Sequence, residues 1–209
     1  MKNRVDRRLR KTGTSLSLLT TLGALSGCAS TPPPRTGFIG DYSKLQKVDE
    51  GKMRYISPQL REFSAYIVDP VQIRAKRDSI KPEQRAEVAR YMHDALVKVL
   101  TTGGYRIATQ AGVGVARVRM AITDIQDAKW YLNLHPATKV TGAGRAGASM
   151  EAEVVDSVTG AQLAAAIRSG RGKEFELNPF STIDDVKSVI DQWAKDAGER
   201  LKELREAKR

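Results

Sequence analysis

Few residues in this 209-residue sequence have the type and spacing that a chemical site requires. The run from Gly142 to Gly147 matches the GxGxxG pattern, but a dinucleotide site needs a strand before that pattern and a helix after it. Here the glycines follow a long loop and lead into a predicted strand, so they indicate a flexible hinge. The two histidines, His93 and His135, have no cysteine or histidine partner at metal-ligand spacing. We therefore predict no enzyme, no metal site and no cofactor site.

The single cysteine, Cys28, is the one side chain whose surroundings suggest a definite reaction. It follows a basic segment, residues 2–11, and a short apolar stretch from Thr12 to Leu25, and a proline-rich run comes after it. A stretch of about 14 residues is too short to span a bilayer, which takes roughly 20, but it suits the h-region of a signal peptide. A lone thiol in this position is free to take a lipid.

The run Leu25-Ser26-Gly27-Cys28 resembles the lipobox of bacterial lipoproteins, in which an aliphatic residue and two small residues precede the cysteine. The small residues allow the signal peptidase to approach the backbone. This resemblance implies that residues 1–27 are a signal peptide and that Cys28 becomes an N-acyl S-diacylglycerol cysteine, with acyl chains such as palmitate. Each buried methylene contributes about 0.8 kcal/mol, so two or three chains hold the protein on a membrane permanently.

The residue after the cysteine indicates which membrane that is. Lipoproteins of Gram-negative bacteria are sorted by this residue, and an aspartate there typically retains them in the inner membrane. This chain has Ala29 instead. We therefore expect the protein at the periplasmic face of the outer membrane.

The net charge excludes one class of partner. The whole chain carries +11, but six basic residues and one acidic residue precede Cys28, so the mature chain carries about +6. Nucleic-acid binding would need a basic stripe, and basic residues alternate with acidic ones along both predicted helices. We therefore expect no nucleic acid. The remaining charge suits contact with anionic head groups or cell-wall polymers, and equally plain solubility.

Apolar periodicity predicts a single α+β domain. Removing the first 27 of 209 residues leaves 182, which suits one domain. Residues 28–40 are predicted to be the acylated cysteine and a proline-rich tether, and residues 41–209 the domain. Helices are predicted over Pro82–Thr102 and from Ser181 or Thr182 to about Leu204. The predicted strands are Met53–Ser57, Ala65–Ile73, Tyr105–Thr109, Val113–Ile125, Ser149–Asp156 and Gln162–Ser169. This order predicts a mixed sheet of about five to six strands with both helices on one face.

A tight hairpin is predicted from Asp156 to Gly160, because Gly160 can take the positive φ that such a turn requires. Pairing Asp156 with Ala161 sets the register of the two strands. The side chains then predicted to share one face are Met150, Ala152 and Val154, opposite Ile167, Ala165 and Leu163.

The same alternation sends Glu151 and Glu153 to the other face of the sheet. If Arg117 and Arg119 lie opposite them on the neighbouring strand, the charges form exposed cross-strand pairs, which are worth only a few tenths of a kcal/mol. We therefore interpret these carboxylates as structural and not as an acid/base pair.

Three segments indicate a family. Thr36 to Leu45, TGFIGDYSKL, resembles the opening of a bacterial lipoprotein family catalogued as domain of unknown function 3313, and Ala65 to Val71 and the Asp156 hairpin are also similar. The resemblance covers most of the mature chain. It implies an envelope lipoprotein without an assigned activity, and it carries over no catalytic residue.

The connection from Ala128 to Gly147 is unusually long for a compact domain, and long connections are often functional. Its large apolar side chains either extend the strand into a long hairpin that folds back onto the core, or form a contact patch for a partner or membrane. They are Trp130, Tyr131, Leu132 and Leu134.

These features favour a noncatalytic, lipid-anchored protein of the cell envelope that binds a protein partner or the cell wall. Two alternatives stay open. An envelope hydrolase would need a cleft where polar side chains converge, and a carrier of a small apolar ligand would need a cavity lined by residues such as leucine and valine.

Overall fold

The computed structural model describes residues 35–75, 80–126, 147–171 and 182–206. Its helices are the 3-10 helix η1, Pro58–Glu62, and the α-helices α1, Pro82–Thr102, and α3, Thr182–Glu206. Its strands are β1 Gln46–Asp49, β2 Lys52–Ile56, β3 Ala65–Val68, β4 Gln72–Ile73, β5 Arg106–Ile107, β6 Val115–Gln126, β7 Gly147–Asp156 and β8 Gln162–Arg171. The predicted α+β class is confirmed.

The strands form one mixed sheet of eight strands, in the order β1-β2-β8-β7-β6-β3-β5, with β4 also paired to β6. The five to six strands predicted from the sequence are too few for two reasons. The predicted strand Ala65–Ile73 is interrupted at Pro70, which has no N–H to give to a ladder, and becomes β3 and β4. Strand β1 has four exposed residues and so shows no apolar alternation.

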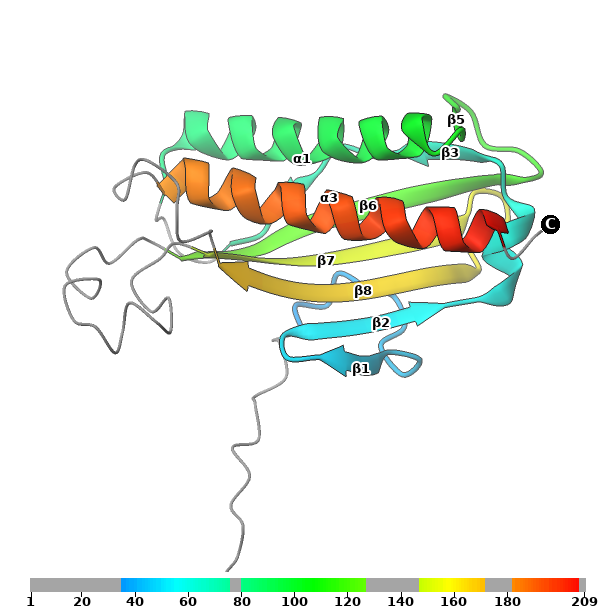
Figure 1. Cartoon of the computed structure of the whole chain (residues 1–209), viewed down its shortest axis with the longest axis horizontal. Helices are drawn as coiled ribbons and strands as arrows, with labels where there is room; N and C mark the ends of the chain where they lie inside the picture. The colour runs from blue at the N-terminus through cyan, green and yellow to red at the C-terminus, as the bar shows by residue number, and fades with distance from the viewer. Residues whose placement is uncertain (1–34, 76–79, 127–146, 172–181, 207–209) are drawn as a thin grey trace, which may run out of the picture.

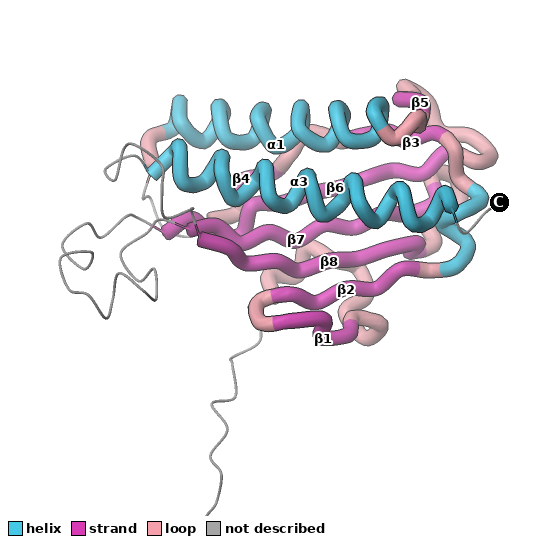
Figure 2. Tube along the Cα trace, viewed as in Figure 1, coloured by secondary structure: helices cyan, strands magenta, loops and turns pink. Residues whose placement is uncertain are grey.

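Both helices pack against the sheet, side by side on the same face (Figures 1 and 2). Helix α1 begins at Pro82 and ends at Thr102, as predicted, and Gly104 just beyond it has a φ of 76°. The apolar stripes of both helices meet the sheet in one large core. Its fully buried helix residues include Val88, Val186, Val189 and Ile190.

The register of the β7–β8 hairpin differs from the predicted one. Val155 pairs with Gln162 as expected, but the ladder then shifts, so that Val154 pairs with Ala164 instead of Leu163. This irregularity, a β-bulge at Leu163, moves every later residue of β8 by one place. Consequently Met150, Ala152 and Val154 share the helix-covered face with Ala164, Ala166 and Arg168.

The opposite face of the sheet is covered by the N-terminal segment, residues 36–45 (Figure 1). Ile39 and Leu45 are buried against Ala165 and Ile167 of β8. Residues 36–40, which the sequence predicts as part of the tether, therefore lie on the sheet.

Candidate functional site

The site residues singled out in the sequence fall in parts of the chain that the structure does not describe. Both the lipid attachment and the contact patch therefore stay predictions. Outside the described residues lie Leu25, Ser26, Gly27 and Cys28, and also Trp130, Tyr131, Leu132 and Leu134.

Two features are absent from the residues that the structure describes. Within them, no three His, Cys, Asp or Glu side chains gather closely enough to hold a metal ion. None of the described helices combines the length and the apolarity needed to cross a bilayer.

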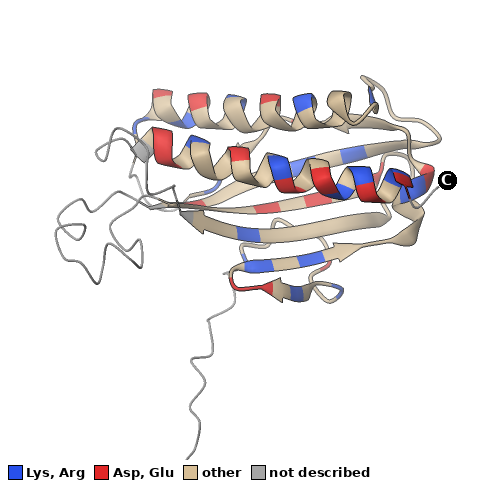
Figure 3. Ribbon diagram, viewed as in Figure 1, with Lys and Arg blue, Asp and Glu red and all other residues tan. Residues whose placement is uncertain are grey.

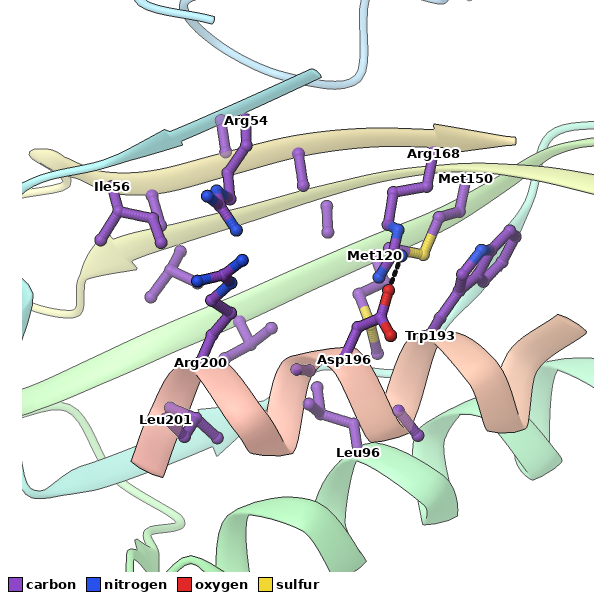
Figure 4. A pocket seen from close by; sticks show the side chains of 18 of the residues that line it. Arg54, Ile56, Leu96, Met120, Met150, Arg168, Trp193, Asp196, Arg200 and Leu201 are labelled. Carbon is purple, nitrogen blue, oxygen red and sulfur yellow. Dashed lines mark hydrogen bonds and ion pairs between the residues drawn. The ribbon is translucent and has the colours of Figure 1, made fainter. Parts of the chain in front are cut away.

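A groove of about 530 Å³ lies between α3 and the helix-covered face of the sheet (Figure 4). It extends from β2 and β8 beneath α3 to α1. Its volume falls within the range of roughly 300–1,000 Å³ that is typical of small-molecule pockets. Its larger apolar side chains include Leu96, Met120, Met150, Trp193 and Leu201.

Alanines explain why this space exists. Ala152 of β7 lies directly opposite Ala166 of β8, and Ala164 lies two residues along the same strand, on the same face. Alanine is depleted in strands because it offers little side chain to pack. These three residues, which we call the alanine floor, leave a gap that the side chains of α3 do not fill.

Arginines stand at the mouth of the groove. Arg54 of β2 and Arg200 of α3 point toward one another across it (Figure 4). A third arginine, Arg168, forms an ion pair with Asp196 of α3. The groove therefore combines an apolar interior with charged side chains of both signs.

Of these arginines, Arg54 is the one without an ion pair to a described residue, although Glu203 attracts its charge. Arg200 pairs with Glu203 at 2.6 Å, whereas half-buried Arg54 has no hydrogen bond or ion pair with any residue that the structure describes. Burial, and then the positive charge of Arg200, lower the pKa of Arg54, and the nearby carboxylate of Glu203 offsets part of this effect. The fold thus holds this cation in surroundings that disfavour its charge.

The opposite face of the sheet holds two carboxylates, and it corrects the prediction that they are exposed. Glu151 is 0% exposed and Glu153 is 2% exposed, because the N-terminal segment covers them. Of the two cross-strand pairs considered from the sequence, one forms: Arg119 lies opposite Glu153 and pairs with it. Arg117 lies opposite Val155 instead and pairs with Asp69 at 2.7 Å.

Both carboxylates bind the N-terminal segment. Glu151 accepts hydrogen bonds from the backbone N–H of Thr36, at 2.7 Å, and from the hydroxyl of Tyr42. Glu153 accepts one from the backbone N–H of Gly40, at 3.0 Å, and another from the side-chain amide of Gln162, at 2.8 Å. We call this set of contacts the carboxylate latch.

The latch has the properties of a structural element. Burial, and then the hydrogen bond to Glu151, raise the pKa of the Tyr42 hydroxyl, so Tyr42 is held as a neutral donor. The oxygens of both glutamates are engaged by donors of the chain itself. The arrangement holds residues 36–42 on the sheet, in agreement with the structural role that the sequence predicted for the carboxylates.

Comparison with known families agrees with the resemblance seen in the sequence. The model of the family described as protein of unknown function, DUF3313, matches residues 34–197. The chain belongs to this family. The match begins just before the N-terminal segment and ends within α3, so the DUF3313 region contains both the latch and most of the groove lining. No curated protein matches the chain.

Several solved structures are distantly similar to this DUF3313 protein. The PelC dodecamer from Paraburkholderia phytofirmans is 14% identical, with 68% of this chain and 93% of that chain covered and a TM-score of 0.43. Lipoprotein GNA1162 from Neisseria meningitidis is 15% identical, with 63% and 99% covered and a TM-score of 0.36. A DUF4136 family protein from Bacteroides thetaiotaomicron is 12% identical, with 73% and 98% covered and a TM-score of 0.40. These values are too low to carry a function to this chain.

Proposed function

We propose that this protein is a noncatalytic lipoprotein of the outer membrane whose domain binds a ligand with an apolar chain in the groove beneath α3. The observation that carries the proposal is the groove itself, with its alanine floor and apolar walls. Of the functions considered from the sequence, a carrier of an apolar ligand is the one that required such a space.

The other candidate functions have less support from the described residues. A protein-binding surface would gather large apolar side chains. The exposed ones that the described ranges contain are Val48, Val113 and Val158, which lie on separate segments. A hydrolase would need polar side chains that converge in the groove. Asp196 is paired with Arg168 and Asp49 with Lys52, and the third carboxylate, Glu199, has no histidine, serine or cysteine beside it in the lining that the structure describes.

The anchor part of the proposal rests on Leu25-Ser26-Gly27-Cys28 and on Ala29. Acyl chains on Cys28 would hold the domain beside a membrane, where molecules with acyl chains are concentrated. A domain that binds such molecules would then work next to their source.

Ligand binding can be tested with the mature chain carrying Cys28→Ser, which has no acyl chains of its own to occupy the groove. We expect a dansyl-labelled fatty acid to bind it saturably, at one molecule per chain, and palmitate to displace the probe. Fluorescence titration measures both. Failure of the probe and of every acyl compound to bind would contradict the proposal.

Anchoring can be tested in cells grown with labelled palmitate. We expect the wild-type protein to take up the label and to sediment with outer membranes, and Cys28→Ala to lose the label and membrane attachment. Ala29→Asp is the matched control for sorting, because it should keep the label but move the protein to the inner membrane. An unlabelled wild-type protein with its leader still attached would disprove the anchor.

A further inference from the structure

Two arginines from distant parts of the chain face each other at the mouth of the groove. Arg54 comes from β2 near the edge of the sheet, and Arg200 comes from the C-terminal half of α3 (Figures 1 and 4). Like charges that approach each other destabilise the folded chain unless an anion lies between or beside them. Glu203 forms an ion pair with Arg200 and also attracts the charge of Arg54, but no hydrogen bond or ion pair joins Arg54 to Glu203 or to any other residue that the structure describes.

The lining of the groove carries charges of both signs, with Lys52, Arg54, Arg168 and Arg200 against Asp49, Asp196 and Glu199. Arg168, two places from the alanine floor on β8, also faces the groove, and Asp196 offsets it. Strand β2 contributes only basic charged residues, Lys52 and Arg54, while charges of both signs alternate along α3 (Figure 3). A solvated arginine could extend away from the groove into water, but the side chain of Arg54 points across the mouth of the groove toward Arg200 (Figure 4).

We infer that Arg54 and Arg200 bind the anionic head group of a lipid with one acyl chain, and that the chain lies along the alanine floor. This inference rests on the proposed function, and it adds the chemical class of the ligand. A guanidinium matches a carboxylate or phosphate through two parallel N–H donors, so two facing guanidiniums can hold one anion between them. The anion would also relieve the repulsion and the burial that lower the pKa of Arg54.

The test compares ligands that share a chain and differ in charge, again on the mature chain with Cys28→Ser. Palmitate and palmitoyl-lysophosphatidylglycerol are the anionic lipids, 1-palmitoylglycerol is the neutral one, and glycerol 3-phosphate is a head group without a chain. We expect the anionic lipids to bind about 10- to 100-fold more tightly than the neutral lipid, the range that hydrogen bonds to charged groups produce. Glycerol 3-phosphate should bind far more weakly than either anionic lipid.

Variants then assign the effect to the two arginines. Arg54→Gln and Arg200→Gln should each lose about 10-fold or more in affinity for the anionic lipids and change little for 1-palmitoylglycerol. Lys195→Gln removes one positive charge from the exposed side of the same helix and should leave all affinities unchanged. Because burial and the charge of Arg200 together disfavour the cation at Arg54, Arg54→Gln should keep or raise the thermal midpoint, which shows that the variant folds.

The outcomes separate this inference from the proposed function. Equal affinity for neutral and anionic lipids would overturn the head-group assignment and leave the apolar groove supported. Binding of glycerol 3-phosphate as tight as that of the lipids would overturn the acyl-chain assignment in favour of a free phosphate ester. Failure of all the lipids to bind would contradict both proposals.

Discussion

Ala166→Leu should abolish binding of an acyl ligand without unfolding the domain. Ala166 lies at the centre of the alanine floor, opposite Ala152, and its side chain faces the space beneath α3. A leucine there would occupy the path of the acyl chain. We expect the affinity for the labelled fatty acid to fall at least about 100-fold, since losing the burial of even a few methylenes at about 0.8 kcal/mol each has that effect. Fluorescence titration measures the loss.

The thermal midpoint of the same variant distinguishes a filled groove from a damaged core. Added methylenes in a packed core cost about 1–3 kcal/mol, but methylenes that fill empty apolar space stabilise. We therefore expect the midpoint of Ala166→Leu to stay level or rise. Ala86→Leu on the exposed side of α1 is the matched control and should bind normally. A lowered midpoint with intact binding would show that Ala166 faces packed core instead of a ligand site.

Glu153→Ala should have the largest effect on stability. It removes the partner of Arg119 and leaves the N–H of Gly40 without its acceptor, while the amide of Gln162 keeps only the carbonyl of Asp41. Buried donors left without partners cost about 1–3 kcal/mol each, and a broken buried ion pair costs about 3–5 kcal/mol. Since Arg119 is 42% exposed, we expect a loss near the lower end, about 3 kcal/mol in the free energy of unfolding. Urea denaturation measures it.

Asp69→Ala is the matched control for the latch. It also breaks a pair between an arginine of β6 and a carboxylate, here just beyond the end of β3, but Asp69 and Arg117 are 28% and 37% exposed. Pairs that solvent reaches are worth about 0–1 kcal/mol. If Glu153→Ala cost no more than Asp69→Ala, the N-terminal segment would not depend on the carboxylate latch.

Helix positions and the hairpin turn could be predicted from the sequence because their signals are local. Apolar residues at helical spacing, with Pro82 before them and glycines after, give the bounds of α1. The turn at Gly160 likewise depends on a single φ of 73°. The bulge at Leu163 has no comparable signal, because either Leu163 or Ala164 could face Val154 by composition alone.

The burial of Glu151 and Glu153 could not be predicted for a different reason. Strand alternation predicts which face a side chain takes, but it does not predict what covers that face. The covering residues, Thr36 to Tyr42, precede the glutamates by more than a hundred positions.

One feature of the groove could be recognised in the sequence. Ala164, Ala165 and Ala166 follow one another in the middle of a strand, where larger residues are preferred. The approach of Arg54 to Arg200 could not be predicted from the sequence, because it depends on how β2 and α3 are placed in the folded domain.

Native mass spectrometry of the mature Cys28→Ser chain, purified gently from a bacterial envelope fraction, tests the proposed ligand most directly. We predict an adduct of one anionic lipid with a single acyl chain per protein, and its absence from the same chain carrying Ala166→Leu. A wild-type groove that retains no lipid and takes none up from a lipid extract would contradict the proposal. So would an adduct that Ala166→Leu retains unchanged.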